Sequence, residues 1–67
     1  MLKTKTFYAI KRSGKYLAQY KNCMAELSPA VEDAFYFQDL QSANDIAGRI
    51  RGANVVEIMI IERALRW

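Results

Sequence analysis

The stretch FYAIKRSGKYLAQY, residues 7–20, predicts two short β-strands joined by a turn at Ser13 and Gly14. Two registers fit this hairpin. A two-residue loop would pair Arg12 with Lys15, whereas a three-residue loop with Gly14 in a left-handed bulge would pair Lys11 with Lys15. The choice matters because a slip of one residue moves all the side chains of a strand to the opposite face.

We prefer the three-residue loop because it separates the two faces better, although it places two lysines opposite each other. One face then carries Tyr8, Ile10, Tyr16, Ala18 and Tyr20, and the other carries Phe7, Ala9, Lys11, Lys15, Leu17 and Gln19. We expect the first face to pack under a helix and the second to meet a partner.

The rest of the chain predicts two more strands and one helix. Residues 21–33 are expected to be irregular or to contain a short helical turn after Ser28. The aromatic run 34–38 predicts a third strand, and Asp39 is a suitable cap for a helix that ends at Gly52. The stripe of this helix consists of Leu40, Ala43, Ile46, Ala47 and Ile50.

Residues 54–63 predict the fourth and longest strand, with Val56, Ile58 and Ile60 under the helix. The order strand, strand, strand, helix, strand predicts a single α+β domain over residues 1–67, with one helix on one face of a small antiparallel sheet. The other face would expose apolar side chains, as an interface with a partner or a second copy does. The predicted interface residues are Phe7, Leu17, Tyr36, Met59 and Ile61, together with Trp67 near the end of the sequence.

Composition limits the classes of function. A core of this size rarely supplies more than about 3 to 5 kcal/mol of stability without help. Cys23 is the single cysteine and histidine is absent, so we expect no disulfide within the chain, no metal site and no cofactor. Without histidine or an arrangement of carboxylates that suggests acid–base chemistry, we expect a protein that is not an enzyme. Self-association is the remaining source of stability.

The charge is unevenly distributed. Residues 1–25 carry six cations and no acid, whereas the remainder carries seven acids and four arginines. The predicted anion-binding or nucleic-acid-binding residues are Lys11, Arg12, Lys15, Lys21, Arg49 and Arg51. A lone cysteine and the lack of a long apolar run near residue 1 predict a cytoplasmic protein without a membrane segment.

The sequence resembles short uncharacterised proteins encoded by phages and prophages of Gram-positive bacteria. The resemblance lies in the hairpin YAIKR-G-KYLA, in Asp33-Ala34-Phe35, in the spaced Ala43 and Ala47, and in Val55-Val56-Glu57. It implies a phage-derived binding protein that acts in the host cytoplasm, and the exposed apolar face predicts that it does so as a homo-oligomer. Its function would be to inhibit a host protein, for example as an anti-CRISPR protein, or to sequester an anionic signalling nucleotide.

The alternative hypothesis is a DNA- or RNA-binding accessory protein that contacts phosphates through the basic hairpin. Such binding would weaken steeply as the salt concentration rises, whereas an apolar protein interface would not.

Overall fold

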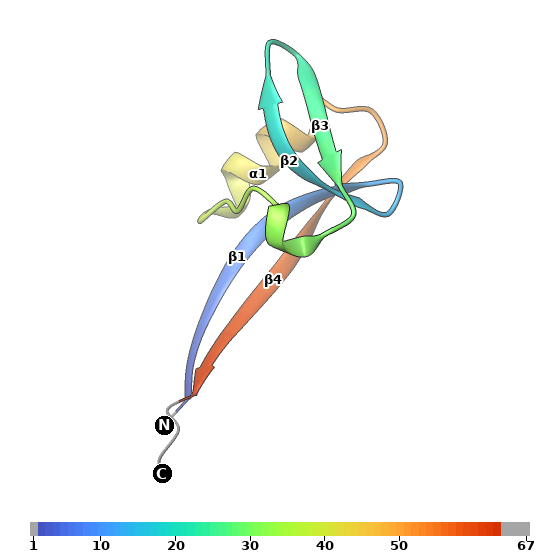
Figure 1. Cartoon of the computed structure of the whole chain (residues 1–67). Coiled ribbons are helices and arrows are strands. Elements are labelled where there is room, and N and C mark those ends of the chain that lie inside the picture. The colour runs from blue at the N-terminus through green and yellow to red at the C-terminus, as the bar shows by residue number, and fades with distance from the viewer. Residues whose placement is uncertain (1, 64–67) are drawn as a thin grey trace.

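The computed structural model describes residues 2–63, and the side chains of residues 3–62. It contains β1 (Leu2–Arg12), β2 (Lys15–Lys21), β3 (Met24–Ser28), the short 3-10 turn η1 (Val31–Asp33), α1 (Leu40–Ala47) and β4 (Ala53–Arg63). The four strands form one antiparallel sheet in the order β3-β2-β1-β4, and α1 packs against it (Figure 1). The predicted α+β architecture is therefore confirmed.

The third strand lies elsewhere than predicted. It is β3, which forms a hairpin with β2 because Asn22 and Cys23 both adopt left-handed backbone angles, with φ of 53° and 61°. No glycine marks this turn, so the sequence pattern did not reveal it. The short helical turn expected before residue 34 is present as η1.

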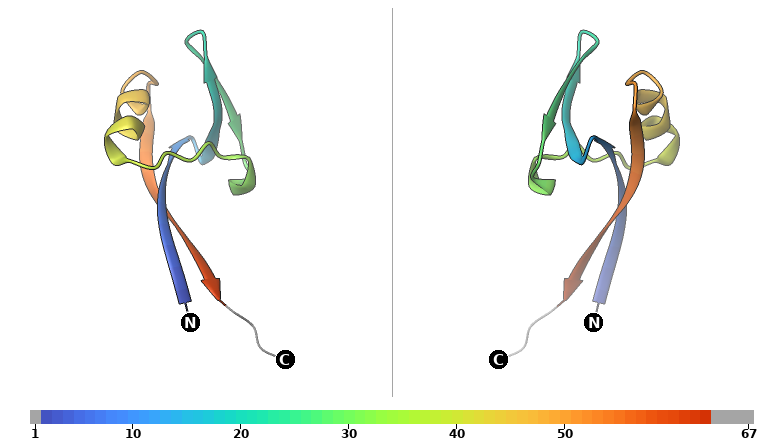
Figure 2. Two further views of the ribbon diagram at one scale, coloured as in Figure 1. Left: turned by 90° about the vertical axis from the view of Figure 1, so that its left-hand side faces the viewer. Right: turned by 90° about the vertical axis from the view of Figure 1, so that its right-hand side faces the viewer.

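Residues 34–38 are extended but do not form a regular strand. Phe37 and Tyr8 exchange backbone hydrogen bonds of 2.7 and 2.8 Å, and the amide of Phe35 donates to the carbonyl of Leu17 at 2.9 Å. The segment thus lies between β1 and β2, which diverge beyond the pairs next to their turn (Figure 2). The prediction of a regular strand here was wrong. The segment is bonded to β1 at Tyr8 and to β2 at Leu17, so it follows neither strand far enough to form a ladder.

The β1–β2 register is the two-residue loop, so the preferred three-residue loop was wrong. Arg12 pairs with Lys15 and Lys11 with Tyr16, while Ser13 and Gly14 adopt the left-handed φ values of 53° and 77° that a type I′ turn requires. Our preference assumed that both strands stay paired along their length. In the structure they separate, so each strand packs against different neighbours.

The hydrophobic core forms where β1, β2 and the end of α1 meet. Its centre is the buried cluster of Ile10, Leu17 and Ile50, and Ala43 of α1 is also fully buried. The expectation that Ile10 packs under the helix is confirmed. Partly buried side chains complete the cluster: Tyr20, Ala25, Leu27, Phe37, Ile46, Ala47, Ala53 and Val55.

The predicted inward face of β4 was wrong. Ile10 pairs with Val55, so these two side chains share a face and Val55 joins the core. Val56 pairs with Ala9 and therefore lies on the opposite face. The apolar residues of β4 occupy both faces, and only the pairing with β1 determined which set packs under α1.

The start of α1 is as predicted. The carboxylate of Asp39 accepts a hydrogen bond of 3.0 Å from the amide of Ser42. This backbone bond, followed by the bond from the Ser42 hydroxyl, lowers the pKa of Asp39. The helix ends at Ala47 rather than continuing to Gly52, where a left-handed φ of 79° leads the chain into β4.

A long two-stranded ribbon extends from this small core. β1 and β4 are paired from Leu2–Arg63 to Arg12–Ala53, and their outer part projects beyond the other elements (Figures 1 and 2). We call this outer part, residues 2–6 and 59–63, the arm. The radius of gyration is 13.7 Å, compared with about 11 Å for a compact domain of this length.

Candidate functional site

Two turns place most of the predicted anion-binding residues at one end of the sheet. The β1–β2 turn carries Arg12 and Lys15, and Arg12 pairs with Ala53 at the start of β4. The loop before β4 carries Arg49 and Arg51 and leads directly to Ala53, so its end lies next to Arg12 (Figure 1). We call this set the basic end; its residues are Lys11, Arg12, Lys15, Arg49 and Arg51.

The side chains of the basic end are available to an anion. Arg12, Lys15, Arg49 and Arg51 are exposed, and residues 9–18 and 48–56 contain no acid. Lys11 is half-buried, with its ammonium 4.8 Å from the centre of the Tyr16 ring, a cation–π contact that orients it. Exposed guanidinium and ammonium groups on adjacent turns can contact successive phosphates of an extended polyanion.

Lys21 does not belong to this group. It lies at the opposite end of the seven-residue strand β2 from Lys15, which corresponds to a separation of roughly 20 Å. This is about two Debye lengths at 0.1 M salt, so the Lys21 charge acts separately from the basic end.

The predicted interface residues fall into different environments. Leu17 is only 1% exposed and belongs to the core, so its predicted place on an exposed face was wrong. The cause is the two-residue loop, together with the divergence of β1 and β2 beyond it. Phe7 and Tyr36 pack on each other with ring centres 5.9 Å apart, and the Tyr36 hydroxyl donates to the carbonyl of Val31 at 2.9 Å. Both are half-buried within the protein itself.

Met59 and Ile61 are exposed on the arm, at 57% and 61% of their surface. Their neighbour Ile60 is 45% exposed, so its predicted place under the helix was wrong. Its exposure follows from its position in the arm, beyond the end of α1. Trp67 lies outside the described residues.

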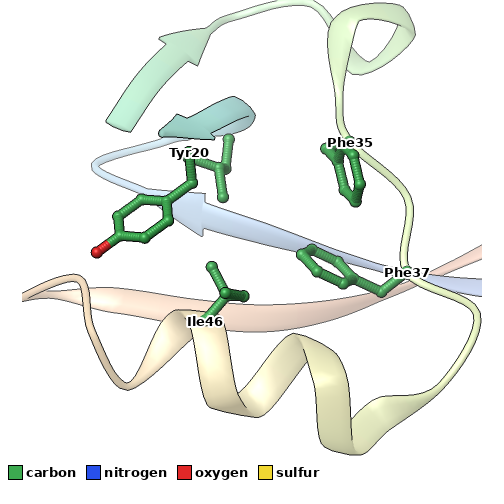
Figure 3. A pocket seen from close by; sticks show the side chains of 5 residues that line it. Tyr20, Phe35, Phe37 and Ile46 are labelled. Carbon is green, nitrogen blue, oxygen red and sulfur yellow. The ribbon is translucent and has the colours of Figure 1, made fainter. Parts of the chain in front are cut away.

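An apolar hollow of about 110 Å³ lies between α1 and the sheet. Leu17, Tyr20, Phe35, Phe37 and Ile46 line it, and the Phe35 and Phe37 rings are 4.9 Å apart (Figure 3). Ligand pockets usually measure about 300–1,000 Å³, and no cation lines this hollow. It is therefore too small and too apolar to hold the anionic nucleotide considered above.

Among residues 2–63, no group of three or more His, Cys, Asp or Glu side chains is arranged to hold a metal ion. Within the same part of the chain, no helix is long and apolar enough to cross a membrane. Cys23, in the β2–β3 turn, is an exposed free thiol.

In comparisons with protein families, curated proteins and solved structures, nothing matches this chain.

Proposed function

We propose that this protein is a non-enzymatic binding protein that contacts the phosphate backbone of a nucleic acid through its basic end. The observation that carries the proposal is the placement of five cations in or next to two turns that the pairing of Arg12 with Ala53 brings together, with no acid in residues 9–18 or 48–56. Nucleic-acid backbones attract such a group because each contact releases condensed counterions.

An extended polyanion fits this surface better than a small nucleotide does. The cations are mostly exposed, and none of them lines the apolar hollow. A free nucleotide usually requires a concave site with converging donors, whereas a phosphate backbone can lie across an open surface. Phosphate contacts carry no direct information about the bases, so the expected binding is independent of the nucleotide sequence.

The resemblance to phage proteins suggests a biological setting for this activity. In that setting the protein would act as a host-directed inhibitor, by occupying nucleic acid that a defence system such as CRISPR must reach. This role depends on the resemblance, whereas phosphate binding depends on the basic end.

The test is fluorescence anisotropy with labelled DNA and RNA duplexes and single strands, measured between 50 and 200 mM salt. If all five cations of the basic end contact phosphates of a duplex, affinity should fall roughly 500-fold over this range. The variant Arg12→Gln/Lys15→Gln/Arg51→Gln keeps two of the five cations, and its affinity should fall only about 12-fold over the same range.

The matched control is Lys3→Gln/Lys5→Gln/Lys21→Gln, which removes the same net charge from positions outside the basic end. It should retain a salt dependence close to that of the unmodified protein. Equal losses of affinity in the two triple variants would show that net charge, and not the basic end, causes binding. Absence of binding at 50 mM salt would overturn the proposal.

A further inference from the structure

The arm exposes a continuous run of large apolar side chains. Met59, Ile60 and Ile61 are exposed at 57%, 45% and 61%. Successive residues of a strand point to opposite faces, so both faces of the ribbon are apolar here. Among the described side chains, the other exposed large apolar residues are Met24, Phe35 and Leu40, which are scattered over separate parts of the chain.

The arm also has an unpaired backbone edge. β4 is an outer strand of the sheet, and its 11 residues contain no proline. Within residues 55–61 the only charged residue is Glu57. Natural proteins usually protect long edge strands with charges, prolines or covering elements, because exposed edges pair with other strands.

Covering this edge would stabilise the folded protein. Among the described side chains, Ile10 and Leu17 are the large ones that are fully buried. A core of this size supplies little stability, and a two-stranded ribbon beyond it is marginal by itself in water. Burial of the arm would add stability to a chain whose single cysteine cannot form a disulfide within it.

We propose that two copies of this chain form a dimer in which the arm edges of β4 pair antiparallel about a two-fold axis at Ile60. In this register Ile60 lies opposite its symmetry mate, and Met59 of each copy lies opposite Ile61 of the other. The apolar run is therefore complementary to itself. Edge pairing covers side chains on both faces of the ribbon at once. Face-to-face packing would cover either Ile60 or the pair Met59 and Ile61.

The charges of the arm are compatible with this pairing. Lys3, Lys5, Ile60 and Glu62 line a shallow groove on one face, where Lys3 lies opposite Glu62 in the β1–β4 register. In the proposed register Glu62 lies opposite Ile58 of the second copy, so the acids do not meet each other. Closed two-fold symmetry of this kind is the commonest form of self-association.

The proposed dimer is elongated and leaves both basic ends exposed, because the basic end and the arm lie at opposite ends of the β1–β4 ribbon. Light scattering should give twice the mass of the chain. Small-angle scattering should give a radius of gyration well above about 14 Å, the value for a compact chain of twice this length. Both measurements omit nucleic acid, so their outcome is independent of the proposed function.

The discriminating variant is Ile60→Lys, which places two ammonium groups at the axis. We expect at least a tenfold loss of dimer affinity. Leu40→Lys is the matched control, because Leu40 is exposed to a similar extent, 48% against 45%, but lies at the start of α1. It should dimerise like the unmodified protein.

A second pair of variants tests the register without adding charge. In a Cys23→Ser background, Ile60→Cys should form a disulfide-linked dimer on mild oxidation, because opposite strand residues satisfy disulfide geometry. Leu40→Cys should not. The proposal is overturned if the protein is a monomer at about 100 μM, because the dissociation constant of the dimer would then exceed this concentration. A compact dimer, or equal behaviour of the Ile60 and Leu40 variants in either assay, would also overturn it.

Discussion

Replacement of Leu17 by alanine tests the central correction to the predicted fold. Leu17 is 1% exposed and lies in the core cluster with Ile10 and Ile50. Its truncation removes three carbon groups, which corresponds to roughly 2 to 2.5 kcal/mol of lost burial. It also enlarges the hollow of about 110 Å³ that Leu17 already borders. Together we expect a loss of about 3 kcal/mol in the free energy of unfolding, within the usual range for buried leucines.

The measurement is urea denaturation followed by far-ultraviolet circular dichroism, at one fixed protein concentration. A small domain has only about 3 to 5 kcal/mol to lose, so Leu17→Ala should be largely unfolded or close to it. Leu40→Ala is the control for an exposed leucine, and its change should remain within about 0.5 kcal/mol. If Leu17→Ala were as stable as Leu40→Ala, Leu17 would not be a core residue and the two-residue register would be refuted.

Two further predictions concern the helix cap and the hairpin turn. The pKa of Asp39 is lowered in the folded protein, so the cap stabilises the fold above the ordinary pKa of an aspartate, and this contribution is lost as the pH falls through the lower folded pKa. Stability measured from pH 7 to pH 2 should therefore decline less in Asp39→Asn than in the unmodified protein; equal declines would contradict the capping argument. At the hairpin turn, Gly14→Ala should cost about 1 to 2 kcal/mol of stability because Gly14 has a left-handed φ. An added Cβ would meet no atom within 4 Å, so the backbone conformation alone causes this cost. Ser13→Asn should raise the melting temperature because asparagine favours this turn, and a fall would contradict the assigned turn type.

The sequence shows which residues of the basic end are charged, but not that they form one surface. The cations of the basic end are visible in the sequence as charges, but they belong to segments more than thirty residues apart. Their convergence follows from the pairing of Arg12 with Ala53, which no local pattern encodes. Lys21 belongs to the same acid-free segment as Lys15, and only its place at the other end of β2 separates it from the group.

The sequence by itself determined the local elements whose physical cause is local. The helix begins directly after Asp39 because that side chain accepts a hydrogen bond from the Ser42 amide three residues later. The alternation of Phe35 and Phe37 on one side and Tyr36 on the other was also predictable, since it follows from extended backbone. The α+β class followed from the number and order of such elements.

Only the tertiary structure decided which faces became core. Apolar residues lie on both faces of β1, β2 and β4, so segregation within a single hairpin could not identify the buried set. The β1–β4 pairing placed Val55 with Ile10, and the insertion of residues 34–38 separated β1 from β2. The physical reason is that burial depends on contacts between segments distant in the sequence. Periodicity within one strand shows which side chains share a face, but not which face is buried.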